Sequence, residues 1–485
     1  MLDRPDEPDN LLTDLYIDGT WRPGSNGERF DVINPADESV IASVASATIA
    51  DADAALDAAE AAFGEWAGRN PRERAEVLRR AFDLMSEQRE EFARLITLEN
   101  GKARADAMGE ATYAAEFFRW FSEEAVRADG LITRAPASGA RIIVQHKPAG
   151  IAVLVTPWNY PAAMGTRKIA PALAAGCPVI IKPASETPLT MLALMPLLEE
   201  AGVPKGLVSV LPSKSSGAIV DHMLHDPRVR VVSFTGSTAV GRKLLHSAAD
   251  QVLKPAMELG GNAPLIVFDD ADLDTAVTGA IQAKMRNLGE ACTAANRFYV
   301  HEAIAEAFTG RFVAAMGKLK LGDGREEGVD VGPLVNAATR DKVAAMVADA
   351  LEKGAKVELG GKVPEGKGFY YPPTVLSGVP ENADCVSDEI FGPVAAIQTF
   401  KDTDDVVRRA NDTEYGLVAY VFTEDMKRGL SVCERLEYGM VGLNRGLVSD
   451  PAAPFGGVKQ SGLGREGGHE GMAEFMETQY ISASW

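Results

Sequence analysis

The feature that most constrains this fold is an alternation of short apolar runs and helical segments between residues 150 and 268. The apolar runs lie at 151–155, 179–181, 207–211, 229–234 and 264–268, and segments of helical composition separate them. The runs are too short for helices and too uniformly apolar for exposed strands, so they are typical of strands buried on both faces. This βαβ succession predicts an α/β fold with a doubly wound, Rossmann-type parallel sheet.

A second alternation follows between residues 273 and 443. We expect a helix at 273–288, further helices beginning at residues 303, 337, 403 and 426, and strands at 297–300, 394–400, 417–422 and 440–443. This pattern predicts another α/β unit of comparable size. Residues 49–88 are Ala-rich and helical, whereas 141–146 and 480–485 have the composition of isolated strands. Such strands often pair elsewhere in the fold or in another subunit.

Composition and charge exclude several classes of function. The 485 residues, 46% hydrophobic and 24% charged, have a normal globular composition and suffice for two or three domains. With 49 Lys and Arg against 69 Asp and Glu, the net charge is −20, which repels nucleic acid and anionic membrane surfaces. A site for an anionic substrate or cofactor must therefore carry its own cations.

The cysteines and the N-terminus indicate a cytoplasmic protein. Residues 1–10 contain no basic and apolar signal pattern, and no apolar run approaches the ~18 residues that span a bilayer. No CxxC pair occurs among the four widely spaced cysteines, which is typical of a reducing compartment. The six histidines show no ligand spacing, so no metal site is predicted.

Unusual loops follow the predicted strands, at the sheet edge where doubly wound folds bind ligands. The turn from Gly236 to Gly241 opens a helix, where backbone N–H groups can face a pyrophosphate. The other segments are TPWNYP (156–161), KPASE (182–186), ELGGN (258–262) and GEACT (289–293). Each signal alone is weak, because most such turns are plain tight turns and a lone cysteine is usually a small buried hydrophobe.

Together and in this order, the motifs resemble the aldehyde dehydrogenase superfamily from about residue 12 to residue 485. The resemblance is carried by TPWNYP (156–161), KPASETP (182–188), FTGSTAVG (234–241), MELGGN (257–262), the GEAC segment ending at Cys292, EIFGP (389–393) and PFGGVKQSGLGRE (454–466). It implies a cofactor-binding domain (1–125 and 148–257), a catalytic domain (258–447) and a β oligomerisation arm (126–147 and 468–485). A homodimer or homotetramer is expected, and the arm would explain the isolated strands.

The resemblance also implies the chemistry, which is oxidation of an aldehyde to a carboxylic acid through a cysteine thioester. Cys292 resembles the nucleophile, because an aldehyde must become tetrahedral before it can lose hydride. The Asn159 amide and the Cys292 N–H resemble the donors to the oxyanion, and Glu258 resembles the general base. Without the family context, Glu258 could be a salt-bridged or helix-capping carboxylate and Asn159 a turn residue. A non-catalytic binding protein on this fold is disfavoured because all three residues are present.

NAD or NADP is the implied cofactor. The positions that resemble its contacts are Thr156, Trp158, Lys182, Ser185, Gly236, Ser237, Gly241, Glu389 and Phe391. NAD-preferring members often place Glu three residues after the equivalent of Lys182, and Ser185 stands there instead, which favours NADP because a hydroxyl can donate to a 2′-phosphate. The neighbouring Glu186 argues against NADP. We therefore predict a preference for NADP with measurable use of NAD.

Within the superfamily, the branch of succinate-semialdehyde dehydrogenases is the most similar, in residues 165–176, 259–274 and 454–468. Arg167, Arg286 and Ser449 match the residues that hold the distal carboxylate of the substrate in that branch. Two guanidiniums and a hydroxyl would supply the local cations that an anionic substrate needs. Alternatively, Arg167 caps or pairs on its own helix, and Arg286 pairs with Glu290 one turn later.

Two departures from the family pattern leave alternatives open. Glu290 stands where the family usually has Gln, and we expect this extra acid to raise the pKa of Cys292. Arg445, close in sequence to Ser449, could add a third cation and favour another semialdehyde, such as glutarate semialdehyde. A broad-range aldehyde dehydrogenase is a further possibility.

Overall fold

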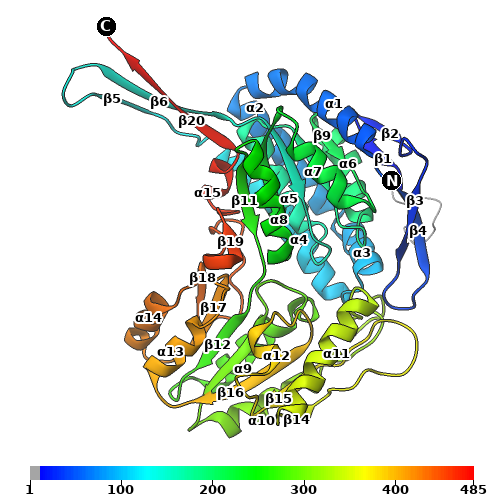
Figure 1. The fold of residues 1–485 in the computed structure, drawn as a ribbon, viewed down its shortest axis with the longest axis vertical. Coiled ribbons are helices and arrows are strands. Elements are labelled where there is room, and N and C mark those ends of the chain that lie inside the picture. Colours follow the sequence, from blue (N-terminus) through cyan, green and yellow to red (C-terminus); the bar gives the residue numbers. More distant parts are fainter. Residues whose placement is uncertain (1–10) are drawn as a thin grey trace.

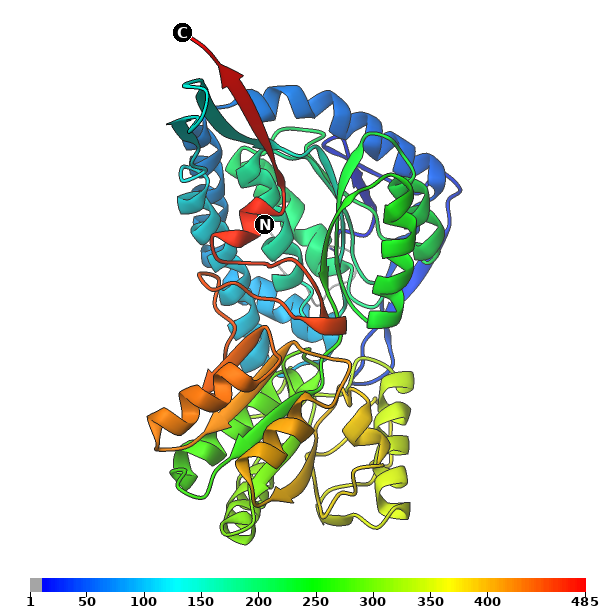
Figure 2. The same cartoon turned by 60° about the vertical axis from the view of Figure 1, so that its left-hand side comes forward.

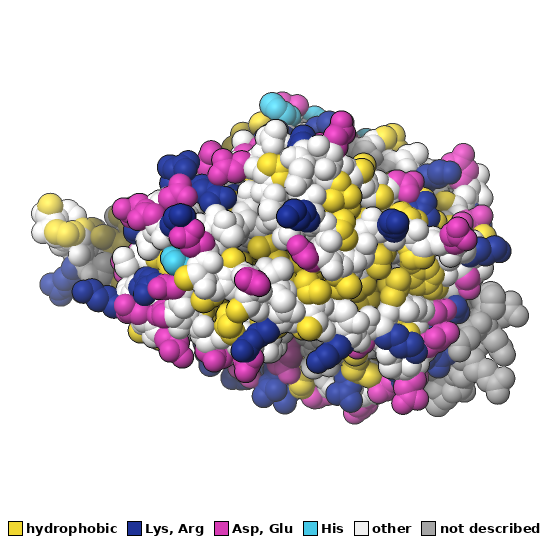
Figure 3. All heavy atoms as spheres, turned by 90° about the horizontal axis from the view of Figure 1, so that it is seen from below, with side chains coloured by type: hydrophobic (Ala, Val, Ile, Leu, Met, Phe, Trp, Pro, Cys, Tyr) yellow, Lys and Arg dark blue, Asp and Glu magenta, His cyan; other side chains and the backbone are white. Residues whose placement is uncertain are grey.

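The computed structural model describes residues 11–485, which form two sheet units, a projecting arm and a small hairpin (Figure 1). Figure 2 shows the two units one above the other, with the arm leaving the upper unit. No helix within residues 11–485 is long and apolar enough to cross a membrane. Seen from the end of the lower unit, charged side chains of both signs surround a band of apolar ones (Figure 3).

The upper unit is the predicted doubly wound sheet. Its eight strands follow the order β19-β11-β10-β7-β8-β9-β1-β2. The parallel strands are β7 (Ile151–Val155), β8 (Val179–Lys182), β9 (Val208–Val210), β10 (Val229–Thr235) and β11 (Lys254–Glu258). The antiparallel strands β1 (Leu15–Ile17), β2 (Thr20–Arg22) and β19 (Gly462–Leu463) complete the edges. The chain order reverses between β7 and β10, so the loops that follow these two strands flank the topological switch point, where such sheets bind ligands.

Helices cover both faces of this sheet, which explains the uniformly apolar strands. Within β7, Ala152 and Leu154 pack on one side, against helices α2 to α6, and Ile151 and Val153 pack on the other, against helices α1 and α7. These helices and the next one are α1 (Ile49–Gly68), α2 (Pro71–Glu87), α3 (Arg89–Asn100), α4 (Arg104–Glu124), α5 (Ala163–Ala175), α6 (Leu189–Ala201), α7 (Ser216–Leu224) and α8 (Thr238–Asp250).

The lower unit is the second predicted α/β unit, with the strand order β14-β15-β16-β13-β12-β17-β18. All neighbouring strands are parallel except β14 and β15. The strands are β12 (Ala263–Val267), β13 (Ala295–His301), β14 (Lys356–Leu359), β15 (Thr374–Ser377), β16 (Val394–Phe400), β17 (Val418–Phe422) and β18 (Met440–Leu443). The helices are α9 (Leu273–Met285), α10 (Ala305–Met316), α11 (Ala337–Glu352), α12 (Asp384–Ser387), α13 (Thr403–Asn411) and α14 (Met426–Arg435).

The predicted helix at 273–288 is wrong at its C-terminal end. Helix α9 stops at Met285, and the short 3-10 segment η2 (Arg286–Gly289) follows. Asn287 and Leu288 there have φ of 50° and 44°, a left-handed conformation that a helix cannot continue through. The chain therefore turns sharply just before Cys292.

The two predicted isolated strands pair with each other. Strand β6 (Arg141–Pro148) lies between β5 (Leu131–Arg134) and β20 (Met476–Ala483), antiparallel to both. Their three-stranded sheet is the arm that projects from the body in Figures 1 and 2. The chain reaches β20 through η3 (Lys459–Ser461) and α15 (Glu470–Ala473), and β3 (Arg29–Ile33) pairs with β4 (Val40–Ala45) as a separate hairpin.

Candidate active site

A cavity of about 240 Å³ lies where loops of both sheet units meet. Eight of the predicted site residues line it: Trp158, Asn159, Gly236, Ser237, Glu258, Cys292, Glu389 and Phe391. They come from the loops after β7, β10 and β11, the turn before β13 and the loop before β16. Thr339 and Lys342 of α11 also line the cavity, and the sequence patterns did not indicate them. Within residues 11–485 no cluster of three or more His, Cys, Asp or Glu side chains could hold a metal ion.

Cys292 and Glu258 lie side by side in this cavity. The Cys292 thiol is half-buried, and burial followed by the negative charge of Glu258 raises its pKa well above the ordinary value. Burial raises the pKa of Glu258 to about 7, while Arg167 opposes the shift and Glu466 adds to it. Neither Glu258 oxygen has a partner with hydrogen-bond geometry, although the thiol lies close enough to lower the pKa of Glu258 slightly. A thiol thus lies beside a carboxyl group that exchanges protons near neutral pH.

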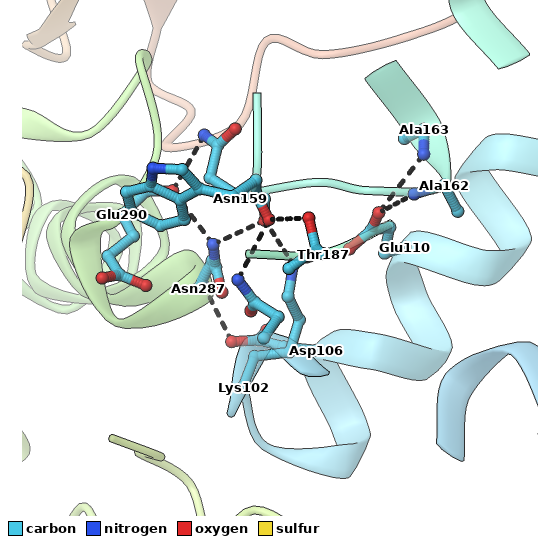
Figure 4. Close-up of polar contacts among 11 residues, drawn as sticks. Lys102, Asp106, Glu110, Asn159, Ala162, Ala163, Thr187, Asn287 and Glu290 are labelled. Carbon is cyan, nitrogen blue, oxygen red and sulfur yellow. Dashed lines mark hydrogen bonds and ion pairs between the residues drawn. The ribbon is translucent and has the colours of Figure 1, made fainter. Parts of the chain in front are cut away.

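Asn159 is held at both its side chain and its backbone. Its amide Nδ2 donates to the carbonyl oxygen of Glu290 at 3.0 Å. Its own carbonyl oxygen accepts from Lys102 Nζ at 2.7 Å and from Asn287 Nδ2 at 2.9 Å (Figure 4). Because an amide carries two N–H donors, one remains for a ligand in the cavity.

The Lys102 ammonium is part of a buried ion pair. Lys102 Nζ lies 2.5 Å from Glu110 Oε2, and both side chains are fully buried. The other oxygen of Glu110 accepts the N–H groups of Ala162 and Ala163, at 2.9 and 3.2 Å, where α5 begins (Figure 4). This carboxylate therefore connects Lys102 to the chain on the far side of Asn159, and together they hold the turn in place.

The turn before Cys292 is held from the opposite side. Asp106 Oδ2 accepts the N–H of the left-handed residue Asn287 at 2.8 Å, and Asn287 Nδ2 also donates to the Glu290 carbonyl at 2.9 Å (Figure 4). Gly289 has φ of 83°, and a Cβ there would lie 2.2 Å from the Gly392 carbonyl oxygen. Only glycine fits this close approach.

Glu290 does not act on the thiol as the sequence suggested. Its Oε1 accepts the N–H of Val335 at 3.0 Å, so the carboxyl points to a different segment, and burial raises its pKa to about 8. The pKa of Cys292 rises mainly through burial and Glu258, with a smaller contribution from Glu389. The expectation that Glu290 raises the pKa of the thiol is therefore wrong.

Two of the three predicted substrate-binding residues meet. Arg286 Nη1 donates to Ser449 Oγ at 3.0 Å, so Arg286 contacts Ser449 rather than Glu290. Its guanidinium carbon lies 5.1 Å from the centre of the Tyr160 ring and 5.6 Å from that of Tyr113, within the range of a cation–π contact. Arg445 is exposed and lines a different, shallow cavity beside α9.

The third predicted substrate-binding residue, Arg167, is buried and partly engaged. Its Nε lies 3.1 Å from Glu466 Oε2, which is close enough for an ion pair but lacks hydrogen-bond geometry. Its guanidinium carbon lies 3.8 Å from the centre of the Phe455 ring, and its Nη2 has no partner. The alternative that Arg167 pairs with an acid on its own helix is therefore wrong, because its ionic partner Glu466 lies far along the chain and its own-helix contact is to the Met164 sulfur. Glu466 also pairs with Lys168.

The predicted cofactor residues lie on both sides of the switch point. Gly236 and Ser237 open helix α8, and Ser237 Oγ accepts the N–H of Val240 at 3.4 Å as the N-cap. A Cβ at Gly241 would lie 2.4 Å from a Leu259 side-chain carbon, so glycine lets the helix approach this loop closely. Thr156 and Gly241 are buried just behind the cavity-lining residues.

Lys182, the last residue of β8, and Ser185, on the loop that follows, do not line the cavity. Lys182 Nζ donates to Ser216 Oγ at 3.0 Å, and burial lowers its pKa to about 8. Ser185 Oγ donates to Glu186 Oε2 at 3.1 Å, so a hydroxyl and an acid share this end of the site.

Glu389 and Phe391 enter from the lower unit. Glu389 Oε1 accepts the N–H of Gly261 at 3.1 Å, and burial raises its pKa to about 7. Lys342 donates to the Glu389 carbonyl at 2.7 Å. Phe391 has a strained φ of 58° and packs edge-on against Trp158, with ring centres 5.3 Å apart. The N-terminus of α8, the Glu389 carboxyl and the Phe391 ring surround one cavity, which also holds the Cys292 thiol and fits a dinucleotide.

A model of the aldehyde dehydrogenase family matches residues 21–481. The chain belongs to this family. It is therefore an NAD(P)-dependent aldehyde dehydrogenase, as its motifs predicted. It is 54% identical to a succinate-semialdehyde dehydrogenase of Paenarthrobacter nicotinovorans over 91% of this chain and 98% of the relative. An NADP-dependent succinate-semialdehyde dehydrogenase of Escherichia coli (strain K12) is 47% identical, and a glutarate-semialdehyde dehydrogenase of Pseudomonas aeruginosa is 48% identical, each over 96% of both chains.

The fold agrees with that of solved members. The crystal structure of a succinate-semialdehyde dehydrogenase from Burkholderia pseudomallei superimposes with a TM-score of 0.97, at 47% identity and over 99% of both chains. The predicted α/β class, with a Rossmann-type unit, a second α/β unit and a β arm, is thereby confirmed.

Proposed function

We propose that this aldehyde dehydrogenase oxidises succinate semialdehyde to succinate, with NADP as the preferred cofactor and NAD as the slower one. The observation that best supports this substrate is the 3.0 Å contact between Arg286 and Ser449, which are 163 residues apart in sequence. Together with the unpartnered Nη2 of Arg167, they form a cationic region that suits a carboxylate. The succinate-semialdehyde dehydrogenases among the relatives support this substrate.

In this proposal Cys292 is the nucleophile. Its sulfur bonds to the aldehyde carbon while its proton passes to Glu258, the unpartnered carboxyl beside it. The negative charge that develops on the aldehyde oxygen is stabilised by the second N–H of the Asn159 amide and by the Cys292 backbone N–H. The contacts of Lys102 and Asn287 to the Asn159 carbonyl keep this donor in position before the substrate arrives.

A bound NAD(P) would supply the hydride acceptor, and the carbon held by Cys292 would then become a thioester. Glu258 first releases the thiol proton to solvent and, ionised again, takes a proton from water while the resulting hydroxide adds to the thioester carbon. The carboxylic acid leaves as the C–S bond breaks, and the sulfur takes the proton back from Glu258. A pKa of about 7 suits Glu258 to accept a proton in this step near neutral pH. The residues that would hold the cofactor are Thr156, Trp158, Lys182, Ser185, Gly236, Ser237, Gly241, Glu389 and Phe391, joined by Lys342.

The cofactor preference depends on the loop after β8. Ser185 offers a hydroxyl to a 2′-phosphate and Lys182 a nearby cation, and the E. coli relative is NADP-dependent. Glu186 opposes this preference, since its carboxylate accepts from Ser185. We expect NADP to exceed NAD in kcat/KM and Ser185→Glu to reverse the order. A wild-type preference for NAD beyond about tenfold would contradict the role given to Ser185.

The proposal assigns residues 1–125 and 148–257 to cofactor binding, 258–447 to catalysis, and 126–147 with 468–485 to oligomerisation as a homodimer or homotetramer. Residues 1–10 of the first domain lie outside the described part. Apolar side chains on the arm support its role, because Ile132 is 71% exposed and Tyr480 58% exposed. Four free cysteines are consistent with the cytoplasm. The arm is tested with the variant Ile132→Asp, whose molar mass in solution is measured by light scattering. We expect this variant to dissociate from the oligomer into smaller species.

The substrate test compares succinate semialdehyde with butanal, which lacks the carboxylate. We expect kcat/KM to be higher for the semialdehyde by on the order of 10²–10⁴, because butanal leaves buried cations unpaired. Arg286→Ala should cost about 2–5 kcal/mol for the semialdehyde and almost nothing for butanal. Equal efficiency with the two aldehydes in the wild type would refute the proposal.

A second candidate substrate is glutarate semialdehyde, on which the P. aeruginosa relative acts. It carries the same terminal carboxylate one methylene farther from the aldehyde, so the same residues could hold it. Including it in the kinetic comparison separates the two, because the correct chain length should have the higher kcat/KM.

A further inference from the structure

Two buried tyrosine hydroxyls near Arg286 have no hydrogen-bond partner. Tyr160 is 7% exposed, and the hydroxyl oxygen of Tyr113 is enclosed although the residue as a whole is only partly buried. Buried tyrosine hydroxyls usually find a partner, and leaving one unpaired costs about 1–3 kcal/mol. Tyr420 shows the ordinary case nearby, since its hydroxyl donates to the Thr293 carbonyl at 2.8 Å. Unpaired hydroxyls at one place therefore call for a ligand.

The two hydroxyls belong to the region proposed for the carboxylate. Both rings lie within 6 Å of the Arg286 guanidinium carbon, at 5.1 and 5.6 Å, and Arg286 donates to Ser449. The Tyr113 ring packs against Phe117 with centres 4.8 Å apart, and Arg167 lies 5.7 Å from the same Phe117 ring. The region thus extends without interruption from Arg167 to Arg286.

Three of the unpaired polar groups in this region are donors, whereas the one acceptor, Glu466 Oε2, already faces Arg167 Nε at 3.1 Å. Arg167 Nη2 and the hydroxyls of Tyr113 and Tyr160 are hydrogen-bond donors that are buried without an acceptor. Burial raises the pKa of both tyrosines above the ordinary value, so both stay protonated and keep their donor hydrogen. A carboxylate has two oxygens with about four lone pairs and accepts several such donors at once. An uncharged alkyl chain would leave all of them unpaired.

We propose that Tyr113 and Tyr160 are specificity-determining residues that donate hydrogen bonds to the distal carboxylate of the substrate. This inference rests on the proposed semialdehyde substrate and adds two neutral donors to its cationic anchors. It also explains why these positions carry tyrosine, because phenylalanine would fill the same space without an unpaired hydroxyl. The unpaired hydroxyls destabilise the free enzyme, and they gain their hydrogen bonds when the substrate binds.

The test removes one oxygen at a time, in Tyr113→Phe and Tyr160→Phe. We expect each variant to lose about 10- to 100-fold in kcat/KM for succinate semialdehyde, as for a lost hydrogen bond to a charged group, and to change little for butanal. The melting temperature without substrate should stay the same or rise, because an unsatisfied group has gone. A purely structural role would instead lower the melting temperature and affect both aldehydes alike.

Tyr371→Phe is the matched control. Its hydroxyl is also buried and unpaired, but Tyr371 packs in the core of the lower unit, away from the two arginines. We expect it to leave the ratio of kcat/KM for the two aldehydes unchanged.

The inference would be overturned if kcat/KM for succinate semialdehyde were undiminished in both Tyr113→Phe and Tyr160→Phe, or if the two aldehydes lost equally. If the wild type itself did not prefer the semialdehyde, the proposed substrate would fail first. If Arg286→Ala abolished the preference and the tyrosine variants kept it, only this inference would fail.

Discussion

Acidification should switch off turnover through Glu258. Burial raises the pKa of this carboxyl from the ordinary 4.5 to about 7, and general-base hydrolysis of the thioester needs the ionised form. At pH 6 only about a tenth of the groups would be ionised, so we expect kcat to fall about tenfold for each pH unit below 7. An exposed glutamate would still be ionised at pH 6 and would show no such loss.

The neighbours of Glu258 let the same limb of the pH profile be moved in both directions. Glu466 raises the pKa of Glu258 and Arg167 lowers it. Glu466→Gln should therefore shift the acid limb to lower pH, and Arg167→Met should shift it to higher pH. Opposite displacements by two substitutions would be difficult to obtain from a general loss of stability.

The assay is kcat at saturating aldehyde and cofactor between about pH 5.5 and about pH 9, within the stable range of the enzyme. Glu389→Gln is the control, because Glu389 lines the same cavity and its pKa is also raised to about 7. We expect the acid limb to persist in Glu389→Gln. A flat profile in the wild type, or a limb that survives unchanged in Glu258→Gln, would refute the reasoning.

Three further substitutions test the proposed nucleophile, the proposed oxyanion donor and the buried ion pair that holds the Asn159 turn. Cys292→Ala should abolish formation of reduced cofactor while cofactor affinity, measured by titration, changes by less than about threefold, and turnover within about tenfold of wild type would remove Cys292 from its role. Asn159→Ala should lower kcat by about 10²–10³, whereas a loss confined to KM would mean that Asn159 only binds substrate. Lys102→Met strands the buried carboxylate of Glu110 and should cost about 3–5 kcal/mol of unfolding free energy. Lys102→Met/Glu110→Gln should cost less, and equal denaturation curves for the two would contradict a buried ion pair.

The parallel sheets were predictable because buried strands have a simple sequence pattern. Strand β7 covers the predicted run 151–155, and β17 and β18 agree with the predicted runs to within one residue. Both faces of these strands meet helices, so nearly every position is apolar and the pattern needs no knowledge of the partner. The helical stretch 49–88 was also correct, but it is two helices, since Pro71 begins α2.

The end of α9 was not predictable from local pattern. Asn287 and Leu288 leave the helix because contacts to Asp106 and Asn159 hold the turn, and those residues lie 181 and 128 positions away. A helical periodicity indicates which side of a segment is apolar, but it does not show where contacts with distant residues end the helix. The same limit applies to β6 and β20, whose pairing joins residues over 300 positions apart.

The motifs predicted that Cys292, Glu258 and Asn159 share one site, but they did not predict the residues that support it. Cys292, Glu258 and Asn159 stand in short ordered motifs and meet at one cavity. Lys102 and Glu110 are charged residues that a sequence pattern assigns to the surface, yet both are fully buried. Tyr113 and Tyr160 carried no signal beyond helical or turn context. Their importance emerges only from which polar atoms lack partners in the folded chain.

The most direct test of the account combines the nucleophile, the base and the substrate in one measurement. Glu258→Gln should form the thioester more slowly, because the thiol must ionise without this base, but should hydrolyse it more slowly still, so the acyl-enzyme should accumulate when the variant is mixed with succinate semialdehyde and NADP. We predict that mass spectrometry of the acid-quenched, digested protein finds one succinyl group on the peptide that contains Cys292, formed together with one equivalent of reduced cofactor. A succinyl group on another residue, or reduced cofactor without any adduct at Cys292, would contradict the mechanism.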